Sequence, residues 1–400
     1  MQSSDARRLL LGYLLLNAST GIAVGMTQLA LPLFAFHLGA SLAEIGVMRA
    51  VAGAGLLLTA IPAGLLNDRF GSQAMFHIGN VAGILCCLML PSIQALSLLL
   101  LALGAEGVAR SVKFNALSSS FYRALPLIGV DKVGWSRASF SIGLGFVGPL
   151  LGGALVGRGD FAVVFVLAAA IQLVPSLIFA RLTPMRRKGA SAPERLGVRG
   201  AARAYAGLLA HRDVPAALGA EAISAGCFNI FNAFIGVAVT TELAMPAWKA
   251  GLFVGAEGVA YILALFLLGR LAQRHGYRAV ALSGLTLLSL ALTGVSLSSG
   301  EEVLMGFSAL LGVGLGLLNL AAATRAATLP GEKGKVAALF STAVSVGIVV
   351  APIYAGIVAT FCGCRAVFIA FVPTCLLLAA YTASRRADVS LEEGEVPETA

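Results

Sequence analysis

Charged side chains are scarce in this sequence. Asp, Glu, Lys and Arg make up 12% of its 400 residues, whereas 58% of the residues are hydrophobic. A soluble domain carries roughly 25% charged residues, so about half of the usual charge is missing. The composition excludes an ordinary soluble protein and indicates a chain that crosses a membrane several times.

Patterns that carry catalysis are also missing. The sequence has no G-x-x-x-x-G-K-S/T, H-E-x-x-H or G-x-S-x-G segment and only four histidines. ATP hydrolysis, metalloprotease and hydrolase chemistry therefore lack their residues. Four of the six cysteines lie inside apolar runs, where cysteine acts as a small hydrophobic residue. We expect no enzyme activity, no metal site and no cofactor.

Long apolar runs are abundant instead. A helix crosses the bilayer core with about 20 predominantly apolar residues, whereas membrane β-strands alternate and are about half as long. The predicted helical spans are 9–36, 45–66, 74–93, 95–121, 138–156, 161–180, 214–241, 247–269, 279–298, 303–324, 336–360 and 363–384. The sequence thus predicts an all-α membrane protein with twelve transmembrane helices.

Basic residues favour one side of the predicted membrane. Most of the 28 lysines and arginines fall at one set of span boundaries and in the central segment 181–213. We assign only Arg49, Arg158, Lys249 and Arg365 to the opposite side. Cytoplasmic loops are rich in Lys and Arg, so both termini are predicted to be cytoplasmic, in a cell inner (plasma) membrane. This asymmetry accounts for the net charge of +9 without a nucleic-acid partner.

Landmarks of the first half recur in order in the second. About two hundred positions separate each member of the first set from its counterpart, the pairs being Gly64 and Gly269, Arg69 and Arg274, Gly71 and Gly276, and Pro149 and Pro352. Parallel repeats of six helices are the plan of one large transporter class. We predict a six-helix bundle over 1–180, a cytoplasmic linker over 181–213, a six-helix bundle over 214–384 and a disordered cytoplasmic tail over 385–400.

Two short segments resemble motifs of the major facilitator superfamily. "GLLNDRFGSQ", residues 64–73, resembles the loop between helices 2 and 3 of that family, whose pattern is G-x-L-x-D-R-x-G-R-R/K. "GPLLGG", residues 148–153, resembles the helix-5 motif of its drug:proton antiporters. The resemblance covers essentially the whole chain and implies the major facilitator fold, with two pseudo-symmetric six-helix bundles that work by alternating access.

The first motif implies a gate. In the family, this loop locks the two halves together on the cytoplasmic side in the outward-facing state. The resemblance implies that role for Gly64, Asp68, Arg69 and Gly71, and the second copy adds Gly269, Arg274 and Gly276. The glycines are expected to let backbones approach closely. Gln273 replaces the acid, so the gate is expected to be asymmetric; the alternative is a plain turn that obeys the positive-inside rule.

The second motif implies a bend between the halves. Its residues are Gly148, Pro149, Gly152 and Gly153. Proline removes one backbone hydrogen bond and can bend a span, and in the family this bend is associated with export. The alternative is tight packing of small residues without any meaning for direction.

Ionisable residues inside the spans are functional candidates, because each costs about 2.5–3.5 kcal/mol to insert. Glu106, Arg110 and Lys113 recur at i, i+4 and i+7 on one helical face, which we expect to line the central cavity. Glu106 is a candidate proton carrier, and the alternative for its pair with Arg110 is a static ion pair. Glu221 and Glu257 are the other proton-coupling candidates, and a hydroxyl-bonded structural carboxyl is the alternative for Glu257.

Softer polar and aromatic positions are further candidates. We expect substrate-cavity contacts from Arg110, Lys113, Asn17, Gln28, Phe228, Asn229, Asn232 and Asn319. Hydrogen bonds between helices explain the polar members equally well.

The sequence therefore predicts a secondary active transporter. The favoured activity is proton-coupled efflux of a small amphipathic or anionic metabolite or drug, with the proton gradient as driving force and no cofactor. One alternative is a proton-coupled importer of a siderophore or other organic anion. Another is a non-transporting membrane scaffold or assembly factor, and a membrane enzyme ranks third. The expected partners are a small-molecule substrate and the lipid bilayer, and the chain is expected to be monomeric.

Overall fold

The computed structural model describes residues 3–129, 132–182, 209, 211, 214–328 and 333–384. Within these ranges nearly every residue is helical and none forms a strand. The predicted linker at 181–213 and the predicted tail at 385–400 lie almost wholly outside the described residues.

Two sets of helices follow one another along the chain. The first set is α1 (Ser3–His37), α2 (Leu42–Phe70), α3 (Ser72–Met89), η1 (Leu90–Ser92), α4 (Leu96–Ile128), α5 (Val133–Ile142), η3 (Gly143–Val147), α6 (Gly148–Val156) and α7 (Phe161–Arg181). The second set is α9 (Val214–Thr241), α10 (Trp248–Leu267), α11 (Gly269–Leu297), α12 (Glu301–Thr328), α13 (Lys333–Cys362), α14 (Ala366–Ala370) and α15 (Val372–Ser384).

The predicted all-α membrane fold is confirmed. In the described part of the chain, 11 helical segments are long and apolar enough to cross a membrane. They include α5, η3 and α6 as one span and α14 with α15 as another. The twelfth predicted span is α4, which is 33 residues long. It is more polar than the others because it carries Glu106, Arg110 and Lys113.

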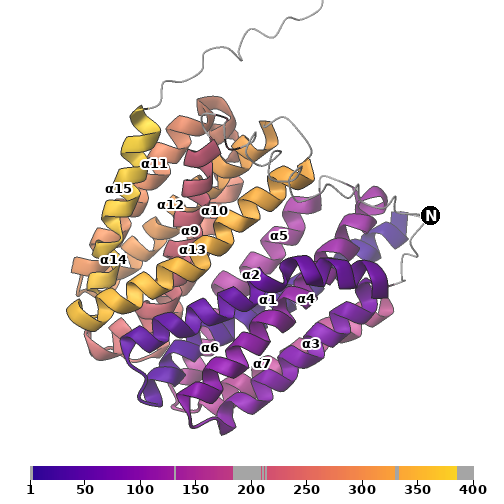
Figure 1. The fold of residues 1–400 in the computed structure, drawn as a ribbon, viewed down its shortest axis with the longest axis horizontal. Helices are drawn as coiled ribbons and strands as arrows, with labels where there is room; N and C mark the ends of the chain where they lie inside the picture. The colour runs from indigo at the N-terminus through magenta and orange to yellow at the C-terminus, as the bar shows by residue number, and fades with distance from the viewer. Residues whose placement is uncertain are drawn as a thin grey trace, which may run out of the picture.

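The two sets lie side by side as two bundles. In Figure 1 the indigo and magenta helices α1–α7 gather on one side, and the salmon to yellow helices α9–α15 gather on the other. We call the face where α1 begins and α15 ends the terminal face, and the other membrane face the opposite face. The bundles meet where α2 packs on α13, where η3 and α6 pack on α10, and where α1 meets α9.

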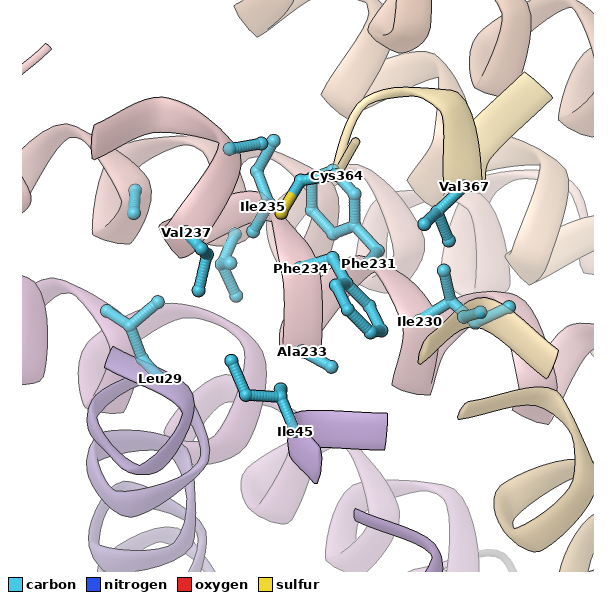
Figure 2. Close-up of a cluster of buried hydrophobic side chains, with 14 of the residues drawn as sticks. Leu29, Ile45, Ile230, Phe231, Ala233, Phe234, Ile235, Val237, Cys364 and Val367 are labelled. Carbon is cyan, nitrogen blue, oxygen red and sulfur yellow. The ribbon is translucent and has the colours of Figure 1, made fainter. Parts of the chain in front are cut away.

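One apolar core joins the bundles near the opposite face. Figure 2 shows Leu29 and Ile45 of the first bundle beside Ile230, Phe234 and Val237 of α9. All five are at most 1% exposed. Water and solutes are excluded from this layer, so the opposite face is sealed.

Near the terminal face the cores are separate. The first bundle has its own cluster, which includes Tyr13, Phe76 and Phe121. The second bundle has another, which includes Val214 and Phe340. No apolar core joins the bundles at this level among the described residues. The molecule is therefore closed at the opposite face and parted at the terminal face.

Glycines allow the bundles to touch along the sealed part. A Cβ added at Gly145 would lie 3.0 Å from the Gly258 Cα, and one at Gly356 would lie 3.1 Å from the Gly46 Cα. One added at Gly153 would lie 3.0 Å from the Gly251 Cα. These helices cross with backbone on backbone, in the way that small residues permit in membranes.

Two glycines mark corresponding turns in the two halves. Gly71, between α2 and α3, has φ 88° and ψ 150°. Gly276 has φ 72° and ψ 166° and breaks α11 into two helical pieces. This backbone region is open essentially to glycine alone. The recurrence at matching positions explains why both residues appear in the sequence repeat.

Alanine at these turns is expected to be destabilising. Gly71→Ala and Gly276→Ala should each lower the free energy of unfolding by about 1–3 kcal/mol. Gly64→Ala and Gly269→Ala are matched controls, because no described residue lies within 4 Å of a Cβ at either position and alanine is the better helix former. Thermal unfolding in detergent measures the difference, and equal effects at all four positions would contradict this account.

Candidate functional site: the central cavity

A cavity of about 360 Å³ lies between the bundles. Its volume falls at the lower end of the 300–1,000 Å³ typical of small-molecule sites. Both halves supply its walls, with Val24 and Met48 on one side and Phe228 and Ile348 on the other. It is therefore a mainly apolar site whose shape depends on how the two bundles are placed.

A second hollow continues the cavity toward the terminal face. It shares Phe114, Phe140 and Tyr261 with the first and adds Asn17 and Arg137. The Asn17 amide donates to Ser136 Oγ at 3.1 Å, so it ties α1 to α5 at this level. The two hollows form a path from the sealed core to the parted face.

Most predicted cavity residues line this path, but not all. The residues that line it are Asn17, Gln28, Arg110, Glu221, Phe228, Asn229 and Asn319. Asn232 is only 2% exposed and its amide donates to the Phe228 carbonyl at 2.9 Å. Neither Asn232 nor Glu257 is among the residues that line the two hollows.

The predicted stripe on the fourth span is wrong in part. Arg110 lines the cavity, whereas Glu106 and Lys113 do not. The two Arg110 nitrogens Nε and Nη2 bond Glu106 at 2.9 and 2.6 Å. Lys113 donates instead to Gln172 of α7 at 3.0 Å. Its side chain packs inside the first bundle, because a single helical face can meet two neighbours along a span of 33 residues.

Sequence reasoning missed Arg49 as a cavity residue. We assigned it to the outer boundary of the second span, but it lies in α2 beyond the helix start, 8% exposed, and lines the cavity. Its Nε and Nη2 atoms have no hydrogen-bond partner in the described structure. Arg49 lies inside the predicted span 45–66, but its place near the end of that span led to its assignment to the boundary, and the sequence does not show that its side chain faces the cavity.

Two carboxyl groups flank Tyr261 of α10. Glu221 lines the cavity from α9, and the charge of Arg137 acts on it from the first bundle. Glu257 lies one turn before Tyr261, 1% exposed, and its Oε2 has no partner in the described structure. Both carboxyl groups interact electrostatically with Tyr261. Glu221 and Tyr261 therefore link the cavity to the buried carboxyl group of Glu257.

The gate motif is not engaged in this conformation. Among the described residues, nothing lies within 4 Å of a Cβ at Gly64 or Gly269, so the close backbone approach expected for the outward-facing state is not made here. Arg69 is exposed and lies over the Phe70 ring at 5.3 Å, and Arg274 is exposed as well. The side chain of Asp68 lies outside what the structure describes. Arg69 and Arg274 are thus both exposed at the parted terminal face of the described structure.

The helix-5 motif contacts both bundles. Gly148 and Gly152 pack against α1, and Gly153 packs against Gly251 of α10. Before Pro149 the chain forms the π-helical turn η3, in which the Gly148 N–H reaches the Gly143 carbonyl. Proline has no N–H to donate, and π-turns are frequent at functional positions of helices. The motif therefore shapes a span at the junction of the halves.

Comparisons with known proteins agree with this architecture. The family model described as Major Facilitator Superfamily matches residues 13–214 and 217–398. A mutant of the nucleoside transporter NupG is similar with a TM-score of 0.81 at 15% identity, over 94% of this chain and 100% of that chain. No curated protein matches the sequence.

Two further solved structures are similar. One is a bacterial homolog of the human lysosomal transporter Spinster, in an inward-facing and unoccupied conformation, with a TM-score of 0.75 and 15% identity over 96% of this chain and 97% of that chain. The other is the human organic anion transporter MFSD10, with a TM-score of 0.67 and 16% identity over 96% and 100%. At these identities the likeness concerns the fold.

Proposed function

The chain belongs to the Major Facilitator Superfamily, and on that premise we propose that it is a proton-coupled exporter of small organic anions. It is a multi-pass membrane transporter by family, and an enzyme function has no support. The substrate, the coupling to protons and the direction of transport are the proposal. We place the chain in the drug:proton antiporter-like branch because of its helix-5 motif.

The single observation that carries the proposal is the central cavity. It is walled by both bundles, sealed by apolar side chains on one side and continued by a hollow on the other. A solute that enters it must leave by the same route unless the bundles rearrange. This is the geometry on which alternating access depends.

Charge favours an anion. The charged residues that line the central cavity are Arg49, Arg110 and Glu221. Glu106 balances Arg110 and the charge of Arg137 acts on Glu221, so Arg49 is the cation left over. Arginine is suited to carboxylates and phosphates because its planar donors bind them in pairs. The proton is carried by one or more of Glu106, Glu221 and Glu257, and no other cofactor takes part.

Flux measurements in inside-out vesicles of known polarity test this function. With an acidic interior, vesicles that contain the protein should accumulate members of a mixture of organic acids, identified by mass spectrometry. Empty vesicles should not accumulate them. Accumulation only in right-side-out vesicles with an acidic exterior would instead show an importer, and accumulation in neither arrangement would contradict transport of organic acids.

Glu106→Gln tests the ion pair in the same assay. Gln keeps the shape but weakens the hold on Arg110, so pH-driven flux should fall roughly tenfold, which corresponds to about 1.4 kcal/mol. Glu302→Gln is the matched control, because Glu302 is exposed at the start of α12. Undiminished pH-driven flux in E106Q removes Glu106 from the mechanism.

A further inference from the structure

Arg49 is a buried cation that the described structure leaves unsatisfied. It lies on α2 near the sealed end of the cavity, only 8% exposed. Its Nε and Nη2 have no hydrogen-bond partner in the described part of the chain, and they are enclosed by protein. An unpaired charge at membrane depth is costly, and natural spans keep one mainly where it has a function.

The charges near Arg49 do not neutralise it. The charges of Arg110 and Glu106 both act on it, but Glu106 already bonds Arg110 through both of its oxygens. The three residues together carry one net positive charge. Glu221, the other acid in the wall, has the charge of Arg137 acting on it, so the positive charge of Arg49 is left without a negative counterpart.

The rest of the wall is apolar. Leu31, Met48 and Leu103 lie on the side of the first bundle, and Phe228 and Leu315 lie on the other. A ligand whose acid group reached Arg49 would place its remaining surface against these side chains. Such a ligand is an amphipathic monoanion.

We propose that Arg49 binds the acid group of the substrate, and that the substrate is an organic monoanion with an apolar body. This inference rests on the proposed function for its meaning, but it concerns binding alone. The substrate enters from the terminal face with its acid group toward the sealed core. Its carboxylate or phosphate ester oxygens accept from Nε and Nη2, the side-by-side geometry that arginine offers to anions.

Ligand-induced thermal stabilisation of the purified protein in nanodiscs tests the proposal. The probes are 4-phenylbutyrate and methyl phenyl phosphate, which both carry one negative charge at neutral pH, with 4-phenylbutanamide and 4-phenylbutylamine as neutral and cationic analogues. At least one acid should stabilise the wild-type protein at a concentration roughly tenfold or more below that of the amide, because charge-assisted bonds are about twice as strong as neutral ones. A preference for either acid tells carboxylate from phosphate ester.

Substitutions at Arg49 identify the residue. Arg49→Gln should abolish the preference for the acid over the amide, and Arg49→Lys should keep a weakened preference. Arg158→Gln removes the same charge from an exposed position and should leave the preference unchanged. R49Q should also raise the unfolding temperature without ligand, because it removes an unpaired buried charge. An arginine with a purely structural role would give the opposite shift.

The outcomes separate this inference from the proposed function. If neither acid is preferred over the amide by the wild-type protein, or if R49Q keeps the preference, the inference is wrong whatever the flux assay shows. If acids bind through Arg49 but no organic acid accumulates in vesicles, the binding site stands and the transport proposal fails.

Discussion

Glu257→Gln is expected to reduce pH-driven transport by at least about a hundredfold, which corresponds to about 2.7 kcal/mol of coupling. Glutamine has nearly the shape of a protonated glutamate but cannot bind or release a proton. The two bundles would still rearrange around the substrate, but that rearrangement would no longer depend on the proton gradient. Exchange of labelled for unlabelled substrate at equal pH should therefore change by no more than roughly twofold, since it needs only the conformational equilibrium.

The position of Glu257 is the reason for this expectation. The carboxyl group is 1% exposed with Oε2 unpartnered in the described structure, and burial of an ionised carboxylate without a partner is costly. The next residue, Gly258, touches the backbone of Gly145 in the other bundle. Separation of the bundles at this crossing would change the surroundings of Glu257 directly. Protonation of Glu257 can then affect whether the bundles stay in contact at the adjacent residue Gly258, and the contact can affect the protonation of Glu257.

Glu221 and Glu106 are expected to contribute less to proton coupling than Glu257. Arg137 acts on Glu221 across the cavity, and Arg110 bonds Glu106. Each of these two carboxyl groups has a cation whose charge acts on it, whereas no cation is found to act on Glu257 in the described structure. The measurement is uptake into vesicles with and without a pH gradient, with Glu302→Gln as control. Equal pH-driven uptake by E257Q and the wild-type protein would remove Glu257 as the proton carrier.

Helix positions could be predicted closely from the sequence because the bilayer imposes a length and a polarity on every span. The predicted span 214–241 coincides with α9, and 161–180 differs from α7 by one residue. The predicted span 279–298 begins just after Gly276, where α11 breaks. The short helical piece from Gly269 to this turn was not predicted, because its residues are too polar to belong to a span.

The sequence indicated which kinds of residue would line the candidate site, but not which neighbouring helix each side chain would meet. Gln28, Asn229 and Asn319 line the cavity as expected, since polar residues in spans usually face other protein or water. Lys113 meets α7 and Arg49 meets the cavity, and neither outcome follows from spacing along one helix. Which neighbour a helical face meets depends on how the helices pack, and this information lies in distant segments of the chain.

A short repeated segment has a structural role that its position in the sequence did not reveal. "GAEGVA" occurs at 104–109 and at 255–260, out of step with the duplication. In both copies the glycine after the glutamate meets a neighbouring backbone: a Cβ at Gly107 would lie 3.2 Å from the Gly55 Cα, and Gly258 lies against Gly145. In both copies, therefore, two helices cross closely at the glycine next to the glutamate. Only the second crossing joins the two bundles.

The second large effect is expected at that crossing. Gly258→Val should prevent α10 and η3 from meeting as they do here, because a Cβ at this position would overlap the Gly145 carbonyl. Overpacking typically costs about 1–3 kcal/mol. We expect this junction to separate when the opposite face opens, so a cost of about 3 kcal/mol in the sealed conformation shifts the balance of conformations by roughly 150-fold. Transport should fall by about that factor, because every cycle must pass through the sealed state.

Distances between the bundles provide the decisive measurement. Nitroxide labels on Arg158→Cys and Glu302→Cys, in a protein whose six native cysteines are replaced, report on the opposite face by electron–electron double resonance. G258V should lengthen this distance relative to the unsubstituted protein, and Gly255→Ala should not, because a Cβ there would meet the side chains of Leu150 and Phe146 at ordinary contact distances of 3.5 and 3.6 Å. Loss of transport with an unchanged distance would place the effect of G258V within one bundle. A longer distance with normal transport would mean that close contact of the two backbones is not needed for the seal, which would then depend on the apolar side chains of Figure 2 alone.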